Sequence, residues 1–218
     1  MNVNLLLSIS VLAFIFGACR RDPSSEPIQK ATSFDPTAVT TSMAEPEPPA
    51  ENIFKASMNL MISALSSMEL TEDFDVDYLK ILVVLRQGAI ELAKMEMAQG
   101  KNEKLKEEAK NILAVHQEDQ DKIKKILESI EAKPGATSSM LLHDALADMI
   151  IKMKNMSMSE NVDKDYVNMS VVLHSGSIAV HKMELAHGVN PQYKKIADKG
   201  RAIDENDMRT LQVWAQAK

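Results

Sequence analysis

The sequence repeats itself at one fixed offset, and this repeat limits the possible folds more than any other feature. A shift of 88 residues, from Asp77 to Asp165, aligns two long segments without a gap. The matched pairs include Met61 and Met149, Asp75 and Asp163, Gly88 and Gly176, Lys94-Met95-Glu96 and Lys182-Met183-Glu184, and Gly100 and Gly188. Such dense matching at one offset indicates a duplicated unit whose two copies bury their apolar faces against each other.

Each copy predicts three helices. In the first, apolar residues recur at the helical spacing 3, 4, 3, as at Met58, Met61, Leu65 and Met68. The second begins in an Asp-rich stretch, which suits the positive end of a helix dipole. It ends at Gly100 in one copy and at Gly188 in the other, where we expect a left-handed glycine cap.

The third helix is expected over residues 102–129 in the first copy and 191–216 in the second. No segment shows the sustained alternation of a strand. The predicted fold class is therefore all-α, a helical bundle made of two tandem three-helix repeats over residues 51–133 and 138–218.

The N-terminus carries an export signal. Residues 5–18 form an almost wholly apolar run, shorter than the roughly 20 residues of a membrane span, which predicts a signal peptide over residues 1–18. Gly17 and Ala18 then precede Cys19, the only cysteine, and this arrangement resembles a bacterial lipobox with Cys19 as the lipidated residue. The alternative is an ordinary cleaved signal peptide with an incidental cysteine. We expect a protein of the cell envelope, anchored by lipid to a membrane and facing the periplasm.

Residues 19–50 predict a disordered linker between this anchor and the repeats. Six of the eight prolines fall there, at Pro23, Pro27, Pro36, Pro46, Pro48 and Pro49. Ser, Thr and Glu fill the gaps and no apolar period is present, so the segment is expected to act as a solvated tether.

Composition and motifs exclude several classes of function. The formal charge is −6, aromatic residues make up 4% of the chain, and no basic stripe is present, which argues against nucleic-acid binding. The repeats contain no cysteine nucleophile, no Gly-x-Ser-x-Gly, no phosphate-binding glycine loop and no His-Glu-x-x-His. We therefore expect a protein that is not an enzyme.

The shared pattern resembles a known family. Both copies contain Asp-x-Asp-Tyr, then Val-Val-Leu, a glycine, Lys-Met-Glu and a final glycine, and the last helix ends near Trp214. This pattern resembles the bacterial family catalogued as domain of unknown function 305, over nearly all of residues 50–218. The resemblance implies a ferritin-like four-helix arrangement, an exported location and, for some members, copper binding through His and Met.

The family's functional positions are altered in both copies. Its His-His pair falls on Leu85-Arg86 in the first copy and on Leu173-His174 in the second. The glutamine of its last helix falls on His116 and on Asp204. The resemblance therefore implies that the fold is kept and that at most half of the His pair remains.

The second copy supplies the candidate metal ligands. His174 and His181 fall on an apolar helical stripe that should face the interior. Seven residues of helix separate them by about 10.5 Å, so either one needs partners from another helix. His with thioether donors suits Cu(I), and the predicted ligands are His174, His181, Met153 and Met156. The alternative for the Met residues is core packing, because the first copy has the same stripe without histidine.

Two other histidines carry weaker signals. Glu184 and His187 form one Glu-x-x-His, whereas a di-iron bundle needs two, so a solvated pair is expected. His116 lies among Glu118, Asp119 and Asp121, which predicts a solvated helical face.

The predicted function is an exported, lipid-anchored helical protein that binds or buffers a metal, copper first, in the cell envelope. The alternative is a metal-free interaction module of the envelope that docks a protein partner or a second copy. An iron-oxidising ferritin-like enzyme is a third class, which the single Glu-x-x-His disfavours.

Overall fold

The structure is a computed structural model that describes residues 53–159 and 161–216. The predicted signal peptide, Cys19 and most of the predicted tether lie outside the described residues. The described chain forms α1 (Ile53–Ser66), α2 (Phe74–Gln99), α3 (Glu103–Leu127), α4 (Met140–Asn155), α5 (Val162–His187) and α6 (Pro191–Gln216). The predicted all-α fold class is confirmed, with three helices in each repeat. None of the helices described has the length and apolar character needed to cross a membrane.

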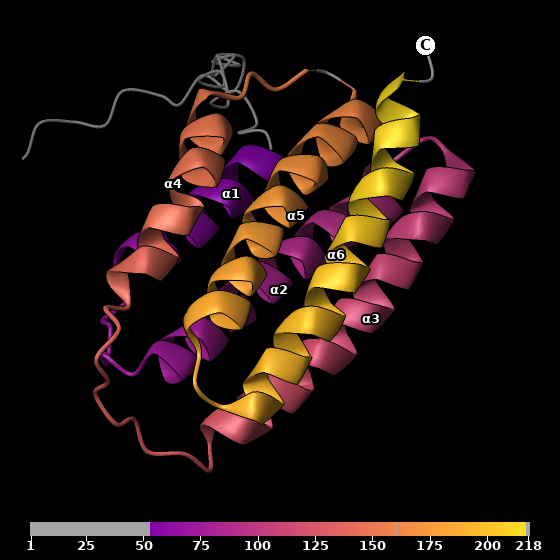
Figure 1. The fold of residues 1–218 in the computed structure, drawn as a ribbon. Helices are drawn as coiled ribbons and strands as arrows, with labels where there is room; N and C mark the ends of the chain where they lie inside the picture. Colours follow the sequence, from indigo (N-terminus) through magenta and orange to yellow (C-terminus); the bar gives the residue numbers. More distant parts are fainter. Residues whose placement is uncertain (1–52, 160, 217–218) are drawn as a thin grey trace, which may run out of the picture. The chain divides into compact units, whose positions relative to one another are not determined.

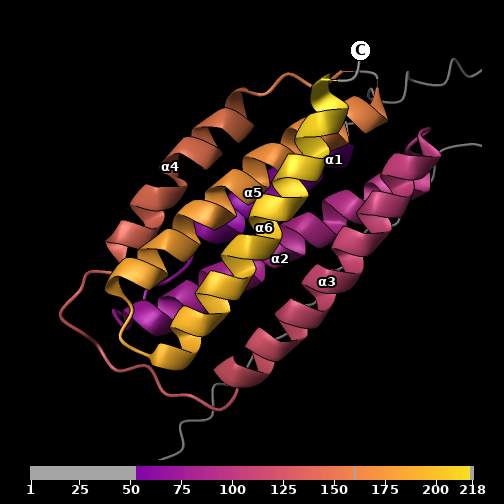
Figure 2. The same cartoon turned by 45° about the vertical axis from the view of Figure 1, so that its right-hand side comes forward.

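The six helices pack around a central pair. Helices α2 and α5 form the central pair, with α1 and α4 against one side of it. Helices α3 and α6 lie on the other side, where α3 packs against α2 and α6 against α5 (Figure 1). The turned view in Figure 2 shows α4 and α3 on opposite sides of the central helices. The four long helices α2, α3, α5 and α6 therefore enclose one interior, to which each repeat contributes two.

Reciprocal hydrogen bonds join the two repeats. The Asp75 carboxylate of α2 accepts from the backbone N–H groups of Val189 and Asn190, which precede α6, at 2.9 and 3.0 Å. At the equivalent position of the other repeat, Asp163 accepts from Lys101 and Asn102, which precede α3, at 2.8 and 3.2 Å. Each repeat thus satisfies the free backbone donors at a helix start of the other repeat. The start of each central helix meets the end of the other, so α2 and α5 run antiparallel.

The other aspartates at these helix starts are also structural. Asp73 caps α2 by accepting from Val76 N at 3.1 Å, as an N-cap residue does. Asp77 is fully buried and accepts from the backbone N and hydroxyl of Thr71, at 2.9 and 2.8 Å. Asp165 binds Ser159 in the same way in the second repeat. The Asp-rich stretch therefore organises the loop before each central helix.

The predicted left-handed glycine caps are wrong. Gly100 has φ −60° and ψ 152°, and Gly188 has φ −59° and ψ 152°, which is extended backbone that any residue adopts. Glycine is needed there because of a close approach, since a Cβ at either position would overlap the folded-back carboxyl group of Glu96 or Glu184.

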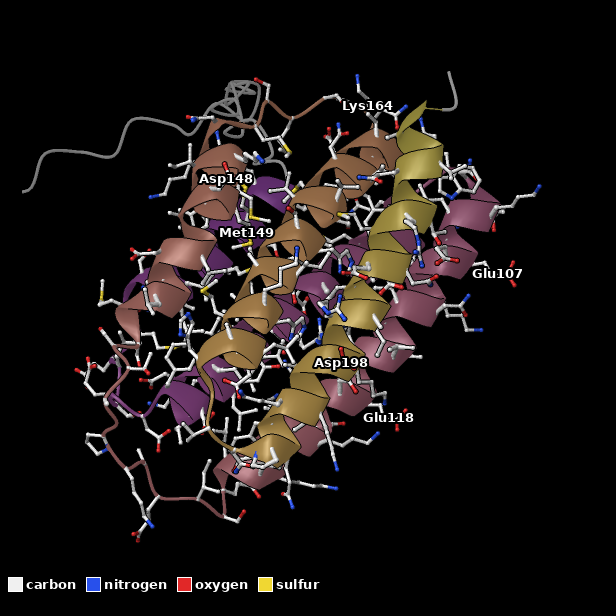
Figure 3. The ribbon with its side chains drawn as sticks, in the orientation of Figure 1. Glu107, Glu118, Asp148, Met149, Lys164 and Asp198 are labelled. Carbon is white, nitrogen blue, oxygen red and sulfur yellow. The ribbon has the colours of Figure 1, made fainter. Side chains whose placement is uncertain are left out.

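Methionines pack against glycines where the short helices meet the central pair. A Cβ at Gly88 of α2 would overlap the sulfur of Met61 from α1, and one at Gly176 of α5 would overlap that of Met149 from α4. Met149 lies between α4 and α5, while Asp148 beside it points away from the bundle (Figure 3). Flexible Met side chains fill this irregular space in both repeats.

The two glycines should respond differently to alanine. In Gly176→Ala the new methyl group meets Cβ and Cγ of Met149 at 2.8 Å, atoms too near the backbone to move away. We expect the free energy of unfolding to fall by about 1–3 kcal/mol, as for other overpacked cores. In Gly88→Ala the methyl group overlaps only the movable sulfur of Met61, and its next contacts lie at 3.5 Å. The helix-propensity gain of about 1 kcal/mol should offset that contact. Urea unfolding of both variants checks this, and equal losses would contradict it.

Candidate metal centre

A polar network occupies the interior between the four long helices, and its centre is Asp204 of α6. One oxygen of this fully buried carboxylate accepts from His174 Nδ1 at 2.8 Å, and the other accepts from Ser177 Oγ at 2.7 Å and His181 Nε2 at 2.9 Å. Arg86 Nη1 of α2 donates to both oxygens, at 2.9 and 3.0 Å. One side chain of α6 thereby binds α2 and α5 together.

The charges in this network balance. Burial alone would raise the pKa of Asp204, but the Arg86 guanidinium and the hydrogen bonds from His174 and His181 hold it well below its usual range. Asp204 is therefore a carboxylate that neutralises Arg86, which is 1% exposed. A buried charge needs such a partner to be tolerated.

His181 uses both of its ring nitrogens. Burial lowers its pKa, against the opposing effect of Asp204, so the neutral ring is favoured. In the tautomer that fits its neighbours, Nε2–H donates to Asp204 and Nδ1 accepts from the Tyr78 hydroxyl at 2.9 Å. This leaves no free lone pair on His181, which acts as a bridge between Tyr78 and Asp204.

Gly200 of α6 makes room for His181. A Cβ at position 200 would lie 2.5 Å from Cε1 and 2.7 Å from Nε2 of the ring. In the first repeat, Ala93 is equivalent to His181 and Ile112 is equivalent to Gly200. The larger side chain is therefore on the third helix in the first repeat and on the central helix in the second. The histidine and the glycine therefore belong together.

His116 is buried, and the predicted solvated face is wrong for it. Its side chain is 0% exposed, its Nε2 lies 3.1 Å from Asp207 Oδ2, and its ring centre lies 5.3 Å from that of His174. Its acidic neighbour Glu118 points outward from α3, as does Glu107 (Figure 3). The inner stripe of α3 was the signal available in the sequence, because His116 continues the apolar series Leu105, Ala109 and Ile112.

His116, His174 and Asp207 form the one group of potential metal ligands found among the described residues. One ligand atom from each lies within 4.8 Å of the other two, and all three side chains are buried. They come from three helices, α3, α5 and α6. His116 Nδ1 is buried without a hydrogen-bond partner, which is costly unless another partner binds it.

The surroundings suit these side chains to bind a metal. Burial, and then the charge of Arg86, lower the pKa of His116, which favours the neutral imidazole that a metal requires. The bond from His174 Nδ1 to Asp204 fixes that ring and leaves Nε2 with its lone pair. A carboxylate behind a ligating histidine is the usual support of such a site. Two atoms bound to one ion at about 2 Å lie no more than about 4 Å apart, so the donors must close by up to about 1 Å.

The other side of the duplicated interior holds an equivalent half-site, built by both repeats, that the Arg86 guanidinium fills. Arg86 is equivalent to His174, and Asp204 is equivalent to His116, so the ion pair of Arg86 and Asp204 mirrors the pair of histidines. One half of the duplicated interior thus carries a cation on a side chain, whereas the other half presents two imidazoles and one carboxyl group.

The predicted ligands lie in different places. His174 belongs to the ligand group, and His181 lies in the network beside it. Met153 is fully buried in the hydrophobic core, where it lines a small cavity with Met58, Met61 and Met169. Met156 lies at the end of α4 and is partly buried against the same core. Sequence reasoning missed His116 and Asp207 as a pair.

Glu184 and His187 do not form the predicted solvated pair. Glu184 is fully buried, whereas His187 is exposed and packs the edge of its ring on Phe74, with ring centres 5.9 Å apart. The two residues point to different surroundings because the carboxyl group of Glu184 turns inward to the start of α2.

Comparison with known proteins gives a match to one family model. No curated protein and no solved structure matches it. Residues 26–127 match the family model described as Domain of unknown function (DUF305). The matched segment takes in all of α1, α2 and α3, including Arg86 and His116. Over this segment, the match supports the resemblance of the chain to the DUF305 family.

Proposed function

We propose that this protein binds a transition-metal ion, with copper the leading candidate, at His116, His174 and Asp207. The buried set of two imidazoles and one carboxylate, drawn from three helices, carries this proposal. Imidazole and carboxylate donors suit Cu(II) and Zn(II), and the affinity of such sites for divalent first-row metals is highest for Cu(II). The set predicted from the sequence, with Met153 and Met156 as thioether donors to Cu(I), would require these side chains to leave the hydrophobic core.

The proposal gives one ion per protein chain. The interior holds two carboxyl groups, from Asp204 and Asp207, and one guanidinium group, from Arg86. One further cation would therefore improve its charge balance. We infer binding and not catalysis, because all three ligands are buried and belong to helices that pack against one another. Storage or buffering of the ion fits such a closed site.

We further propose that the protein works in the cell envelope, held by lipid on Cys19 and facing the periplasm. Support comes from the apolar run of residues 5–18, the small residues before Cys19 and the Pro-rich tether that follows. A metal-binding bundle on such a tether would be held near the membrane surface.

Metal titration tests the proposed site. The protein should bind Cu(II) at one ion per chain, in competition with a chelator of known affinity. His116→Ala and His174→Ala should each lower the affinity by more than about 100-fold, since loss of a mere outer-shell partner costs about 10–100-fold. His187→Ala, at an exposed histidine, is the matched control and should bind like the unchanged protein. Affinity that survives both interior substitutions would contradict the site.

Lipidation has a separate test. Cells grown with a labelled fatty acid should incorporate the label into the protein, and Cys19→Ser should abolish incorporation because no other cysteine is present. Unlabelled protein that is still processed would support the ordinary signal peptide instead.

A groove in the first repeat favours the second candidate function, a protein-interaction module. It lies between α1, α2 and α3 and is lined mainly by apolar side chains, including Leu60, Met61, Val83 and Val84. Leu60 is 73% exposed. The equivalents of Leu60 and Ala64 in the second repeat are Asp148 and Lys152, which form an ion pair at 2.6 Å. Only the first repeat therefore presents this face to an apolar partner.

Self-association tests this second candidate. If the groove binds a second copy, the unchanged protein should form dimers as its concentration rises, and Leu60→Asp should shift it to monomer. Sedimentation equilibrium measures both. Asp148→Leu, at the equivalent position, is the control that should leave the first-repeat groove intact. A protein that stays monomeric throughout would remove the second copy as the partner.

A further inference from the structure

Two carboxyl pairs, each with a fully buried glutamate, join the repeats at opposite ends of the central helices. Glu184 of α5 lies beside Asp75 of α2, and Glu96 of α2 lies beside Asp163 of α5. The two pairs are equivalent under the sequence repeat. Neither takes part in the metal centre, and the family resemblance gives them no role.

Geometry at Gly188 brings the first pair together. A Cβ there would lie 2.7 Å from Asp75 Oδ1 and would overlap a Glu184 oxygen, so both carboxyl groups meet at this glycine. Both oxygens of Asp75 already accept from backbone N–H groups, which fixes that side as the acceptor. Glu184 is 0% exposed, and no N–H or O–H group of the described chain donates to its oxygens.

The second pair repeats this arrangement. Glu96 is 0% exposed, both of its oxygens lack a donor, and its carboxyl group folds over Gly100. Asp163 accepts from the next two backbone N–H groups, at Lys101 and Asn102. The same contact is therefore present at both equivalent places of the repeat.

Two ionised carboxylates cannot share a buried contact without a cation or a proton between them. A proton shared along a hydrogen bond relieves both the repulsion and the missing donor. We propose that Glu96 and Glu184 are protonated at neutral pH and donate hydrogen bonds to the aspartates of the opposite repeat. Each pair of a protonated glutamate and its aspartate, called a latch below, joins the two repeats.

The raised pKa values of Glu184 and Glu96 agree with this geometry. Burial, and then the hydrogen bond to and charge of Asp75, raise the pKa of Glu184 to about 9. Burial and Asp163 raise the pKa of Glu96 to about 8. The other charged or titratable groups around the pairs are Asp73, Tyr78, His187, Tyr193 and Lys194 near Glu184, and Lys106 and Tyr166 near Glu96. The lysines act in the opposite direction but more weakly than burial and the aspartates.

Protonated latches make the stability of the bundle depend on pH. A glutamate released by unfolding has an ordinary pKa near 4.5. Each latch therefore contributes its full stability below about pH 4.5 and loses it as pH rises to about 8 or 9. The buried histidines His116 and His181 have lowered pKa values, so they favour unfolding as the pH falls through the ordinary value of 6.5, which lies below the range where the latches are lost. The range from pH 7 to 9 thus isolates the latches.

The first experiment reads the protons directly. In ¹³C-labelled, unchanged protein, two glutamate carboxyl signals should keep the shift of the protonated form at pH 7 and titrate near pH 8 and 9. No substitution is needed, so this measurement does not depend on a variant that folds. If every glutamate carboxyl signal titrates below about pH 6, the proposal is overturned.

The second experiment measures the consequence. From pH 7 to 8 the unfolding constant of the unchanged protein should rise by up to tenfold for each latch, one proton being released per latch. In the double variant Glu96→Gln and Glu184→Gln the rise should vanish, because a carboxamide donates N–H at every pH. Glu91→Gln is the control, since the Glu91 side chain on α2 is 39% exposed and pairs with Lys94 at 2.9 Å. A double variant that keeps the full pH dependence would overturn the latches.

Discussion

The interior of this bundle depends on one buried carboxylate. Asp204 of α6 holds Arg86 of α2 and His174, Ser177 and His181 of α5 in a single set of hydrogen bonds. Removing one partner from such a buried ion pair costs about 3–5 kcal/mol, because the other charge is left without compensation. These bonds fix the position of α6 against both central helices. They also determine the chemistry of the interior, since they engage His181 in hydrogen bonds and orient His174 toward His116.

Paired differences between the two repeats account for the unequal halves of the bundle. Arg86 stands where the second repeat has His174, and it is tolerated because Asp204 stands opposite. His181 stands where the first repeat has Ala93, and it fits because Gly200 replaces the bulk of Ile112. Each change in one helix is matched by a change in its neighbour, so the packing is conserved while the polar groups differ. The outer framework of aspartates and helix starts has stayed the same in both repeats.

Sequence reasoning was strong where the signal is periodic and weak where it depends on distant contacts. The apolar spacing and the repeat predicted an all-helical fold, and the six helices follow them. The caps at Gly100 and Gly188 were misjudged because a carboxyl group folding back over each glycine, and not a local turn, requires them. His116 was misjudged because its acidic neighbours in sequence point to solvent while its own side chain points inward. The pairing of His116 with Asp207 joins residues 91 positions apart, which no local pattern reveals.

The coordination of the bound ion is the most direct test of the account. X-ray absorption spectroscopy of the copper-loaded protein reports which elements surround the metal. We predict a first shell of nitrogen and oxygen only, with the signature of two imidazoles, from His116 and His174, and one carboxylate, from Asp207. Sulfur in the first shell would contradict this ligand set and point to thioethers such as Met153 and Met156.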